Sequence, residues 1–521
     1  MKKIFKLGCV VMSAAIAASM ALGLTACDPN GGGGGGGTNG GGTISVHYKT
    51  GGFGKEVYNR LAADYKALTG VTVKYVPSQT TDEIKSLLQS KQEKNDIVMP
   101  LLNIYQSQDS KLLEDLTDVY NATPDGESVA IKDKFNQSLY EYAEAADGNR
   151  YLMFANNSVS AFCYNIGTLD EAFGEGKWSL PKTTNQFVDM AQELKSKGYY
   201  AFSASASINY NWDYVGVVWW AQYEGMESYK NYYYGKYWDE ASGEWKLGKE
   251  INDAPGRRYA LETLGQILSK SNGYTHQHAG RMGFTEAQDA FLSNGYVDDK
   301  KKVAFMVNGD WLENEMSSSL MLNPQKIGMM RNPVISKLAE KLPTVGTESR
   351  LVEVVTAVDE GKTGLAGVSE EDFEAVRQAR LMGYTATPNY PIAIPAYRPE
   401  NKKKLAKDYL VYLFSDRAQK IIAGELQGLT YPTSYVPDDS LMSDFVKTRY
   451  EAFGNDFIPV FPINASAMAY RGGLGDLPGV SGADKRFFNG DSASSLLSTC
   501  TSDLDSYWES KYLKALVDSE N

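Results

Sequence analysis

Short apolar segments alternate with amphipathic ones at the start of the folded chain, and this alternation constrains the fold more than any other feature. Strands are predicted at residues 43–48 (TISVHY), 71–76 (VTVKYV) and 96–100 (DIVMP). Between the first two strands apolar residues recur with a helical period, and Gly70 stands where a helix C-terminal cap belongs. Because strands that alternate with helices form parallel sheets covered by helices, we predict an α/β fold.

The remaining segments continue this pattern less regularly. We expect a buried strand within residues 151–167, and a strand, a tight turn and a helix within 301–316 (KKVAFMVNGDWLENEM). Residues 389–424 predict a strand that leads into a long amphipathic helix, and 495–517 predict a terminal helix. Residues 338–384 are less regular and could form an inserted lobe or flap. The chain has 521 residues, which is enough for two large domains.

The N-terminal segment does not belong to this α/β body. Three lysines among the first six residues precede a run of apolar and small residues from 7 to 24, and Cys27 follows shortly after. A charged start, an apolar run and small residues before a cleavage point describe a secretory signal. A membrane span is the alternative, but the run is only weakly apolar and no stop-transfer charges follow it.

This segment resembles a bacterial lipoprotein signal, in which leucine and two small residues precede a cysteine. The resemblance implies that residues 1–26 are removed and that Cys27 then carries acyl chains, palmitate among them. Several acyl chains on one residue exceed what stable anchoring needs. The glycine-rich residues 27–42 would form a flexible tether. We therefore expect a lipid-anchored protein on the extracytoplasmic face of a bacterial cell membrane.

Composition excludes several classes of partner and site. The formal net charge of −12 argues against nucleic acid and against adsorption to an anionic lipid surface. Two cysteines, Cys163 and Cys500, belong to the body; they could pair, but we expect burial because Cys163 lies in an apolar strand. Three histidines and no metal-ligand spacing predict no metal and no cofactor.

The sequence carries no familiar catalytic motif, so we predict no catalytic residues and no enzyme. It contains no GxSxG elbow, no HExxH motif and no phosphate-binding loop. A membrane-tethered glycoside hydrolase remains an alternative, because two carboxylates about 5–9 Å apart would suffice for it and acidic residues are plentiful. Binding of a non-sugar solute such as a peptide is a second alternative.

In order along the chain, the lipoprotein start and the segments TISVHY, DIVMP, LLEDLTDVY, VAFMVNGDW and IPAYRPENKKKLAKDYLVYLFSDRAQK resemble a family 1 extracellular solute-binding protein. Such proteins serve carbohydrate ABC importers, and the nearest type is the maltose- and oligosaccharide-binding class. The resemblance runs from about residue 43 to 422. It implies a two-lobe periplasmic-binding-protein-like fold of type II with hinge crossovers, a sugar or oligosaccharide in a central ligand cleft, and delivery to the permease transmembrane subunits. We expect a monomer.

The same resemblance implies discontinuous lobes. We assign residues 43–158 and 300–388 to lobe 1, with a possible insertion at 343–388. Residues 159–299 and 389–521 are assigned to lobe 2.

A sugar offers flat apolar faces and rings of hydroxyl groups, so its site needs aromatic platforms and polar side chains. Trp311 follows a glycine turn after a predicted strand, where open α/β sheets place ligands. In similar proteins the matching tryptophan stacks on the sugar, although Trp311 could instead pack in the core. Asp310 and Glu313 have the spacing of a capping box, which favours a structural role for Asp310.

The segment NYNWDY supplies second-lobe candidates, because similar proteins place sugar-contacting residues at this point. Asn211, Trp212 and Asp213 are predicted to bind the ligand, and Asn209 and Tyr210 are weaker candidates.

In the first lobe, Asn103 and Gln106 follow the third strand and could hydrogen-bond hydroxyl groups, or lie in a solvated loop. Tyr48, with Lys49 and Thr50, ends the first strand and is similarly placed. Arg471 lies in a glycine-rich loop and could cap the cleft; a structural salt bridge is the alternative.

Overall fold

The computed structural model describes residues 41–49, 51, 54–109, 111–206, 209–292, 301–454, 457–461, 480 and 482–514. The predicted signal peptide, Cys27, Thr50 and Arg471 lie outside these residues.

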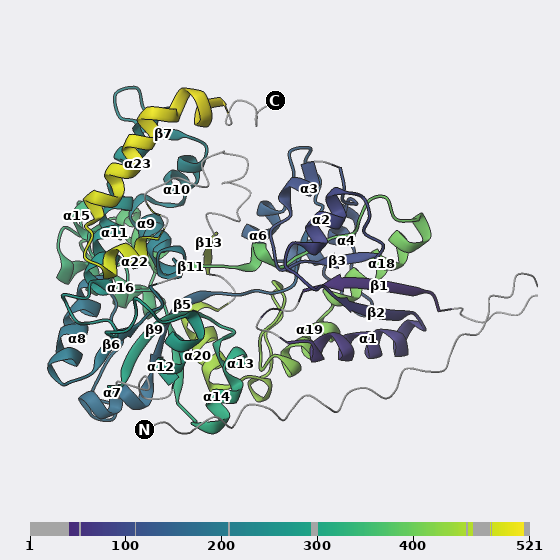
Figure 1. Ribbon diagram of the computed structural model, residues 1–521, viewed down its shortest axis with the longest axis horizontal. Coiled ribbons are helices and arrows are strands. Elements are labelled where there is room, and N and C mark those ends of the chain that lie inside the picture. The colour runs from purple at the N-terminus through teal and green to yellow at the C-terminus, as the bar shows by residue number, and fades with distance from the viewer. Residues whose placement is uncertain are drawn as a thin grey trace, which may run out of the picture. The chain divides into compact units, whose positions relative to one another are not determined.

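The first lobe is built on a parallel sheet of three strands in the order β2–β1–β3 (Figure 1). The strands are β1 (Thr43–Tyr48), β2 (Thr72–Pro77) and β3 (Ile97–Met99). Helix α1 (Glu56–Thr69) connects the first two and ends at Gly70, whose φ of 75° is the left-handed conformation that glycine adopts at helix ends. The predicted alternation of strands and helices is therefore confirmed for this part of the chain.

Smaller elements complete this part of the first lobe. They are α2 (Glu83–Gln89), α3 (Tyr105–Asp109), α4 (Thr117–Asn121), α5 (Ile131–Lys134), α6 (Gln137–Tyr142) and β4 (Met153–Phe154).

Residues after 390 return to the first lobe. Strand β12 (Pro391–Ile392) pairs antiparallel with β4. Helices α18 (Glu400–Leu413) and α19 (Asp416–Glu425) pack against α1. The hydroxyl groups of Tyr75 on β2 and Tyr409 on α18 lie 2.8 Å apart and join the two parts of this lobe.

The second lobe is built on a mixed sheet in the order β13–β11–β5–β9–β6, with β10 also paired to β5. Strand β5 runs antiparallel to β9, with Ser160 opposite Gly309, and β9 runs parallel to β6. The strands are β5 (Ser160–Asn165), β6 (Tyr200–Ser203), β9 (Val303–Gly309), β10 (Ile327–Met330), β11 (Met382–Tyr384) and β13 (Ile458–Val460). Every described residue of β5 and β9 is buried, so this pair lies at the centre of the lobe.

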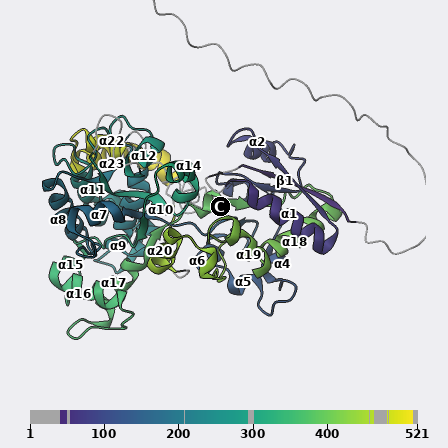
Figure 2. The ribbon, with the colours of Figure 1, turned by 90° about the horizontal axis from the view of Figure 1, so that it is seen from below.

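Helices surround this second sheet (Figures 1 and 2). They are α7 (Ile166–Phe173), α8 (Thr184–Ser196), η1 (Trp212–Gly216), α9 (Val217–Glu224), α10 (Met226–Tyr233), η2 (Lys249–Asp253), α11 (Pro255–Leu268), α12 (Phe284–Leu292), α13 (Leu312–Glu315), α14 (Ser317–Leu322), α15 (Leu338–Lys341), α16 (Glu348–Asp359), α17 (Glu370–Leu381), α20 (Asp444–Phe453), α22 (Ala483–Phe488), α23 (Ala493–Tyr507) and η6 (Trp508–Tyr512). Short 3₁₀ turns are η3 (Thr387–Asn389) and η4 (Asp439–Leu441). A separate hairpin consists of β7 (Lys236–Asp239) and β8 (Glu244–Leu247).

The lobes divide the chain differently from the sequence expectation. Residues 303–384 were expected in the first lobe, but β9, β10 and β11 all pair within the second sheet. Residues 391–425 were expected in the second lobe, but they pack on the first sheet. The physical reason is that β9 hydrogen-bonds along β5, so the chain does not leave the second lobe until it has passed β11.

Residues 338–384 are more regular than expected. They form α15, α16 and α17, and α17 packs against α9 of the second lobe. Thr347 and Ser369 start the two longer helices, because their side-chain oxygens accept hydrogen bonds from the backbone nitrogens of Arg350 and Asp372.

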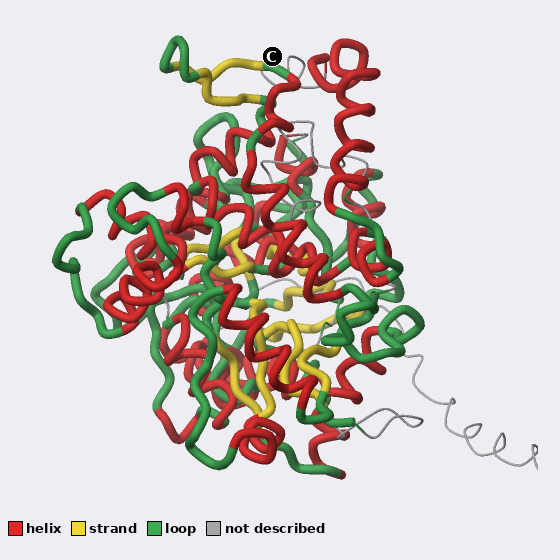
Figure 3. Tube along the Cα trace, turned by 90° about the vertical axis from the view of Figure 1, so that its left-hand side faces the viewer, coloured by secondary structure: helices red, strands yellow, loops and turns green. Residues whose placement is uncertain are grey.

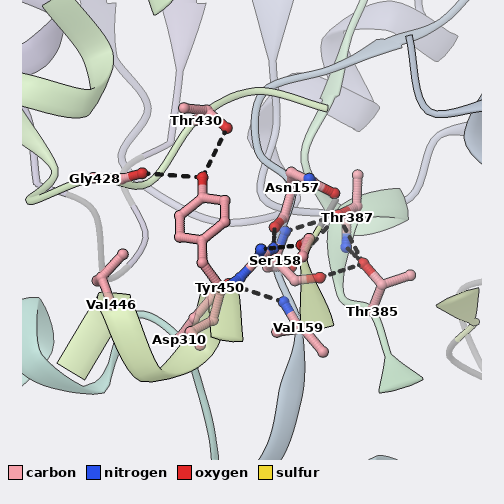
Figure 4. A network of polar contacts seen from close by, with 12 residues as sticks. Asn157, Ser158, Val159, Asp310, Thr385, Thr387, Gly428, Thr430, Val446 and Tyr450 are labelled. Carbon is pink, nitrogen blue, oxygen red and sulfur yellow. Dashed lines mark hydrogen bonds and ion pairs between the residues drawn. The ribbon is translucent and has the colours of Figure 1, made fainter. Parts of the chain in front are cut away.

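The chain passes between the lobes at residues 155–159, between β4 and β5, and again at residues 385–390, between β11 and β12. These two crossing segments are tied together by polar groups near the second sheet (Figure 4). The Arg449 guanidinium donates to the Asn157 carbonyl at 2.7 Å and lies 3.3 Å from a carboxylate oxygen of Asp310. The same oxygen of Asp310 accepts a hydrogen bond from the Val159 nitrogen at 3.0 Å. From the second crossing, the Thr385 hydroxyl donates to the Ser158 carbonyl at 2.7 Å. The crossings therefore share one buried network, in which Arg449 is the cation.

Cys163 and Cys500 are both buried and neither forms a disulfide, which confirms the expectation of burial.

Candidate functional site

The segment NYNWDY begins a helical stretch in the second lobe, made of the π-helical turn η1 and α9. The Asp484 carboxylate caps its start: it accepts hydrogen bonds from the backbone nitrogens of Asn211 (2.9 Å) and Trp212 (3.1 Å), and from Asn211 Nδ2 (2.8 Å). The Trp212 side chain is 1% exposed and lies so close to Gly216 that a Cβ there would be 2.3 Å from the indole. Asn211 and Trp212 therefore anchor this turn in the interior.

Asp213 and Tyr214, the next two residues, are only half-buried. Among the residues that the structure describes, none hydrogen-bonds to the Asp213 carboxylate, and burial raises the pKa of this group to about 7. A carboxyl group with unused acceptor positions, close to its point of ionisation at neutral pH, is suited to accept hydrogen bonds from ligand hydroxyl groups.

Tyrosine rings join Asp213 to the crossing segments and to the first lobe. The ring centroids of Tyr214 and Tyr384 lie 4.8 Å apart. Burial raises the pKa of Tyr384 well above its ordinary value; Tyr214, Asp213 and the first-lobe residue Tyr142 add to the rise. Tyr384 pairs with Val460 on β13, and the next residue, Phe461, stacks on the first-lobe residue Tyr142 at 4.2 Å, so Tyr384 lies near the point where the two lobes meet.

A second tyrosine, Tyr390, is the last residue before β12 and is half-buried. Burial raises its pKa above the ordinary value, and Tyr214 of the second lobe and Tyr58 of the first lobe reinforce the rise. A Cβ on Gly51 would lie 3.1 Å from the Tyr390 ring and 3.3 Å from Leu101. Tyr390 therefore lies beside Gly51 and Leu101 of the first lobe.

The first-lobe segment 101–107, which we call loop 101–107, includes the first residues of α3. It carries three buried polar atoms that have no hydrogen-bond partner among the described residues: Asn103 Nδ2, Tyr105 Oη and Ser107 Oγ. Each unpaired buried polar group costs about 1–3 kcal/mol, so three of them in one loop indicate partners supplied by a ligand or by water. The ring of Tyr105 lies 4.8 Å from that of Tyr142, which stacks at 4.2 Å on Phe461 of the second lobe. The loop is thus connected to the point where the lobes approach.

The other predicted residues occupy different surroundings. Trp311 is 7% exposed, and its indole folds back over Gly309, where a Cβ would lie 2.3 Å away. Tyr48 is 6% exposed and packs edge-on against Tyr58 at 4.8 Å, within the first-lobe core. Gln106 is exposed on the loop.

The sequence favoured a structural role for Asp310 as a helix cap. Asp310 does have a structural role, but not as a cap. Its carboxylate bonds to the Val159 nitrogen and to Arg449, and no side-chain cap is formed at the start of α13. Burial raises the pKa of Asp310 to about 6. This residue belongs to the crossing network rather than to a surface that a ligand can reach.

We call Asp213, Tyr214, Tyr384, Tyr390 and the loop 101–107 the interlobe residues. The sequence prediction named Asp213 and Asn103 but not Tyr214, Tyr384 or Tyr390, although Tyr214 ends the quoted NYNWDY segment and Tyr390 precedes the quoted IPAYRPEN. The interlobe residues combine flat rings, one carboxylate and unpaired donors, a set that suits a neutral, hydroxyl-rich molecule.

Neither a candidate metal-binding cluster nor a helix able to span a membrane occurs in the described part of the chain. No group of three or more histidine, cysteine, aspartate or glutamate side chains is placed to hold a metal ion there. Likewise, no helix within the described ranges is long and apolar enough to cross a membrane.

Solved structures of low sequence identity share this fold. A chitin oligosaccharide binding protein superimposes with a TM-score of 0.58 at 15% identity, covering 89% of this chain and 98% of that one. A family 1 extracellular solute-binding protein from Bifidobacterium longum subsp. infantis gives 0.54 at 17% identity, over 90% of this chain and 100% of that one. RafE in complex with raffinose gives 0.55 at 13% identity, over 88% and 98%. No curated protein sequence matches the chain.

The sequence itself matches a family. The profile of the family described as bacterial extracellular solute-binding protein aligns with residues 60–449, which include both sheets except β1 and β13, and all the interlobe residues. The two-lobe architecture agrees with this match. The chain therefore belongs to the bacterial extracellular solute-binding proteins.

Proposed function

We propose that this protein captures a sugar or oligosaccharide between its two lobes and delivers it to the permease of a carbohydrate ABC importer. The observation that carries the proposal is that both lobes carry polar groups without a hydrogen-bond partner among the described residues: the Asp213 carboxylate on one lobe, and three side-chain atoms of loop 101–107 on the other. The sugar-binding proteins among the structural neighbours support the choice of ligand class.

Each kind of interlobe residue has a separate task in this proposal. Tyr214 and Tyr390 offer ring faces to the C–H surface of a sugar. The ionised Asp213 carboxylate accepts hydrogen bonds from sugar hydroxyl groups, and Asn103 Nδ2 donates one. Of the other predicted contacts, we retain Trp311 and Gln106 as residues at the edge of the site. Tyr48, Asn211 and Trp212 stabilise the lobes from inside.

Binding would be coupled to movement of the lobes. A ligand that contacts both lobes does so only in the closed arrangement, so it shifts the population toward that arrangement. The closed form is then the one that the permease recognises.

Anchoring and location complete the proposal. Acylated Cys27 would hold the protein at the extracytoplasmic face of the bacterial cell membrane, and the glycine-rich tether would let the two lobes reach the permease. We further propose that the protein is a monomer and has no catalytic activity of its own.

A panel of mono- and oligosaccharides tests the proposal. Thermal-shift measurements identify the sugar that stabilises the protein most, calorimetry gives its affinity, and chromatography of the incubated sugar detects hydrolysis. Stabilisation without turnover supports the proposal. Turnover would favour a membrane-tethered glycoside hydrolase, and stabilisation by peptides but by no sugar would favour a peptide binder.

A further inference from the structure

The hairpin of β7 and β8 stands out from the helices of the second lobe (Figure 3). Its two strands pair with each other, and Trp238 lies directly opposite Trp245, with ring centroids 5.5 Å apart. A cross-strand pair of this kind stabilises a hairpin by about 0.2–1 kcal/mol. It does not explain why the Trp238 side chain is 45% exposed, since a half-exposed indole costs free energy in water.

A pocket of about 400 Å³ lies beside this hairpin, within the size range of small-molecule sites. Trp220, Tyr232 and Ile251 line it and are nearly completely buried. The hydroxyl of Tyr232 accepts a hydrogen bond from Arg257 at 2.9 Å, which fixes that ring in place. The pocket thus has a rigid, apolar floor before any ligand arrives.

Aromatic rings and ionised groups share the more exposed wall of the pocket. Trp238, Trp245 and Tyr237 supply the rings. Lys236 supplies a donor, and Glu250, with Asp253 and Glu240, supplies acceptors; among the described residues none of these four forms a hydrogen bond or an ion pair. We call this set of lining residues the hairpin pocket.

The aromatic and charged side chains that line the hairpin pocket indicate which class of ligand it binds. An apolar molecule would leave the carboxylates of the hairpin pocket without water, which is costly. A small anion would meet four carboxylates, since Glu224 also lines the pocket, and a simple cation would meet Lys236 at the exposed wall. A saccharide satisfies all the groups at once, because each hydroxyl donates and accepts while the ring C–H face stacks on indole.

We infer that the hairpin pocket binds a saccharide unit, as a second site on the outer surface of the second lobe. None of its lining residues belongs to the interlobe residues, so the inference stands whether or not the interlobe ligand is a sugar. A polysaccharide held at this surface would raise the local concentration of chain ends near the interlobe residues.

Affinity electrophoresis of the full mature chain tests this site. Native gels contain soluble xylan, starch, mixed-linkage β-glucan or galactomannan, and a bound polysaccharide slows the protein. The wild-type protein should be slowed in at least one gel. Replacing both tryptophans (Trp238→Ala with Trp245→Ala) should raise the apparent dissociation constant at least about tenfold.

Two further variants separate binding from folding of the hairpin. Glu250→Gln leaves the tryptophan pair intact and should weaken retardation at an unchanged melting temperature. Leu247→Ala, on the same hairpin but outside the pocket lining, should leave retardation unchanged. Equal migration of wild-type protein in all gels, or retardation that Glu250→Gln and the double tryptophan variant both preserve, would overturn the inference.

Discussion

Asp213→Asn should weaken sugar binding and at the same time stabilise the ligand-free protein. Burial raises the pKa of Asp213 from 3.8 to about 7, so the folded protein binds this proton more tightly than the unfolded chain does. A carboxyl group with a raised folded pKa contributes its full stability below the unfolded pKa and loses it as the pH rises through the folded value. The shift corresponds to an upper bound of about 4 kcal/mol above neutral pH.

Asparagine has nearly the same shape and cannot ionise, so it avoids this loss. The melting temperature of the Asp213→Asn variant should match that of the wild type below a pH of about 4, where both forms of the protein are neutral at this position. The variant should become progressively more stable between about pH 4 and pH 7, and the difference should then level off. Scanning fluorimetry across this pH range measures the effect without ligand.

Sugar binding should respond in the opposite direction. A hydrogen bond to a charged group contributes about 1.5–3 kcal/mol, so the variant should bind its best saccharide roughly ten to a hundred times more weakly at pH 8. Wild-type affinity should rise between about pH 6 and pH 8, because ionised Asp213 is the better acceptor, whereas the affinity of the variant should stay flat. Equal affinities for the two proteins, or wild-type affinity that falls as the pH rises, would refute the reasoning.

Three other substitutions test the surrounding structure. Arg449→Met should lower the free energy of unfolding by about 3–5 kcal/mol, because it leaves the Asp310 carboxylate buried without its cation; urea denaturation measures this, and a loss below about 1 kcal/mol would contradict the role of the network. Trp212→Ala should destabilise the protein by about 3–5 kcal/mol, since the indole is 1% exposed; a variant with the wild-type melting temperature but no sugar affinity would instead place Trp212 against the ligand. Cys27→Ser should move the expressed protein from the detergent phase to the aqueous phase in phase partitioning, and an unchanged detergent fraction would speak against acylation at this residue.

Local sequence signals predicted the individual elements well. The first strands and α1 follow from apolar periodicity, and Gly70 marks the end of the helix by its left-handed conformation. The regular helices of 338–384 could also have been found, because Ser369 is followed three residues later by the acidic residue whose nitrogen it caps. That signal is local and was present in the sequence.

Local sequence signals could not predict which lobe each segment joins. Strand β9 joins the second sheet by pairing with β5, more than a hundred residues earlier, and nothing within VAFMVNG specifies that partner. Likewise, residues 391–392 are strand-like in either lobe, and their pairing with β4 decides the matter. Long-range pairing of this kind depends on the whole sheet rather than on residue type.

In the candidate site, too, local sequence predicted the residue types, whereas a distant contact determines which side chains are buried. The residue types of NYNWDY predicted polar and aromatic groups at this place, but Asp484, some 270 positions later, decides which of them turn inward. Because Asp484 caps the turn through Asn211 and Trp212, these two are buried and Asp213 is left half-exposed. The direction of each side chain therefore depended on a distant residue.

A crystal structure with the saccharide that stabilises the protein most is the most direct test of binding between the lobes. We predict electron density for a sugar ring between Asp213 and Tyr214 on one side and loop 101–107 on the other, with Asn103 Nδ2 and the Asp213 carboxylate hydrogen-bonded to hydroxyl groups. A saturated crystal in which these groups contact only protein or water, with the sugar elsewhere, would contradict the account.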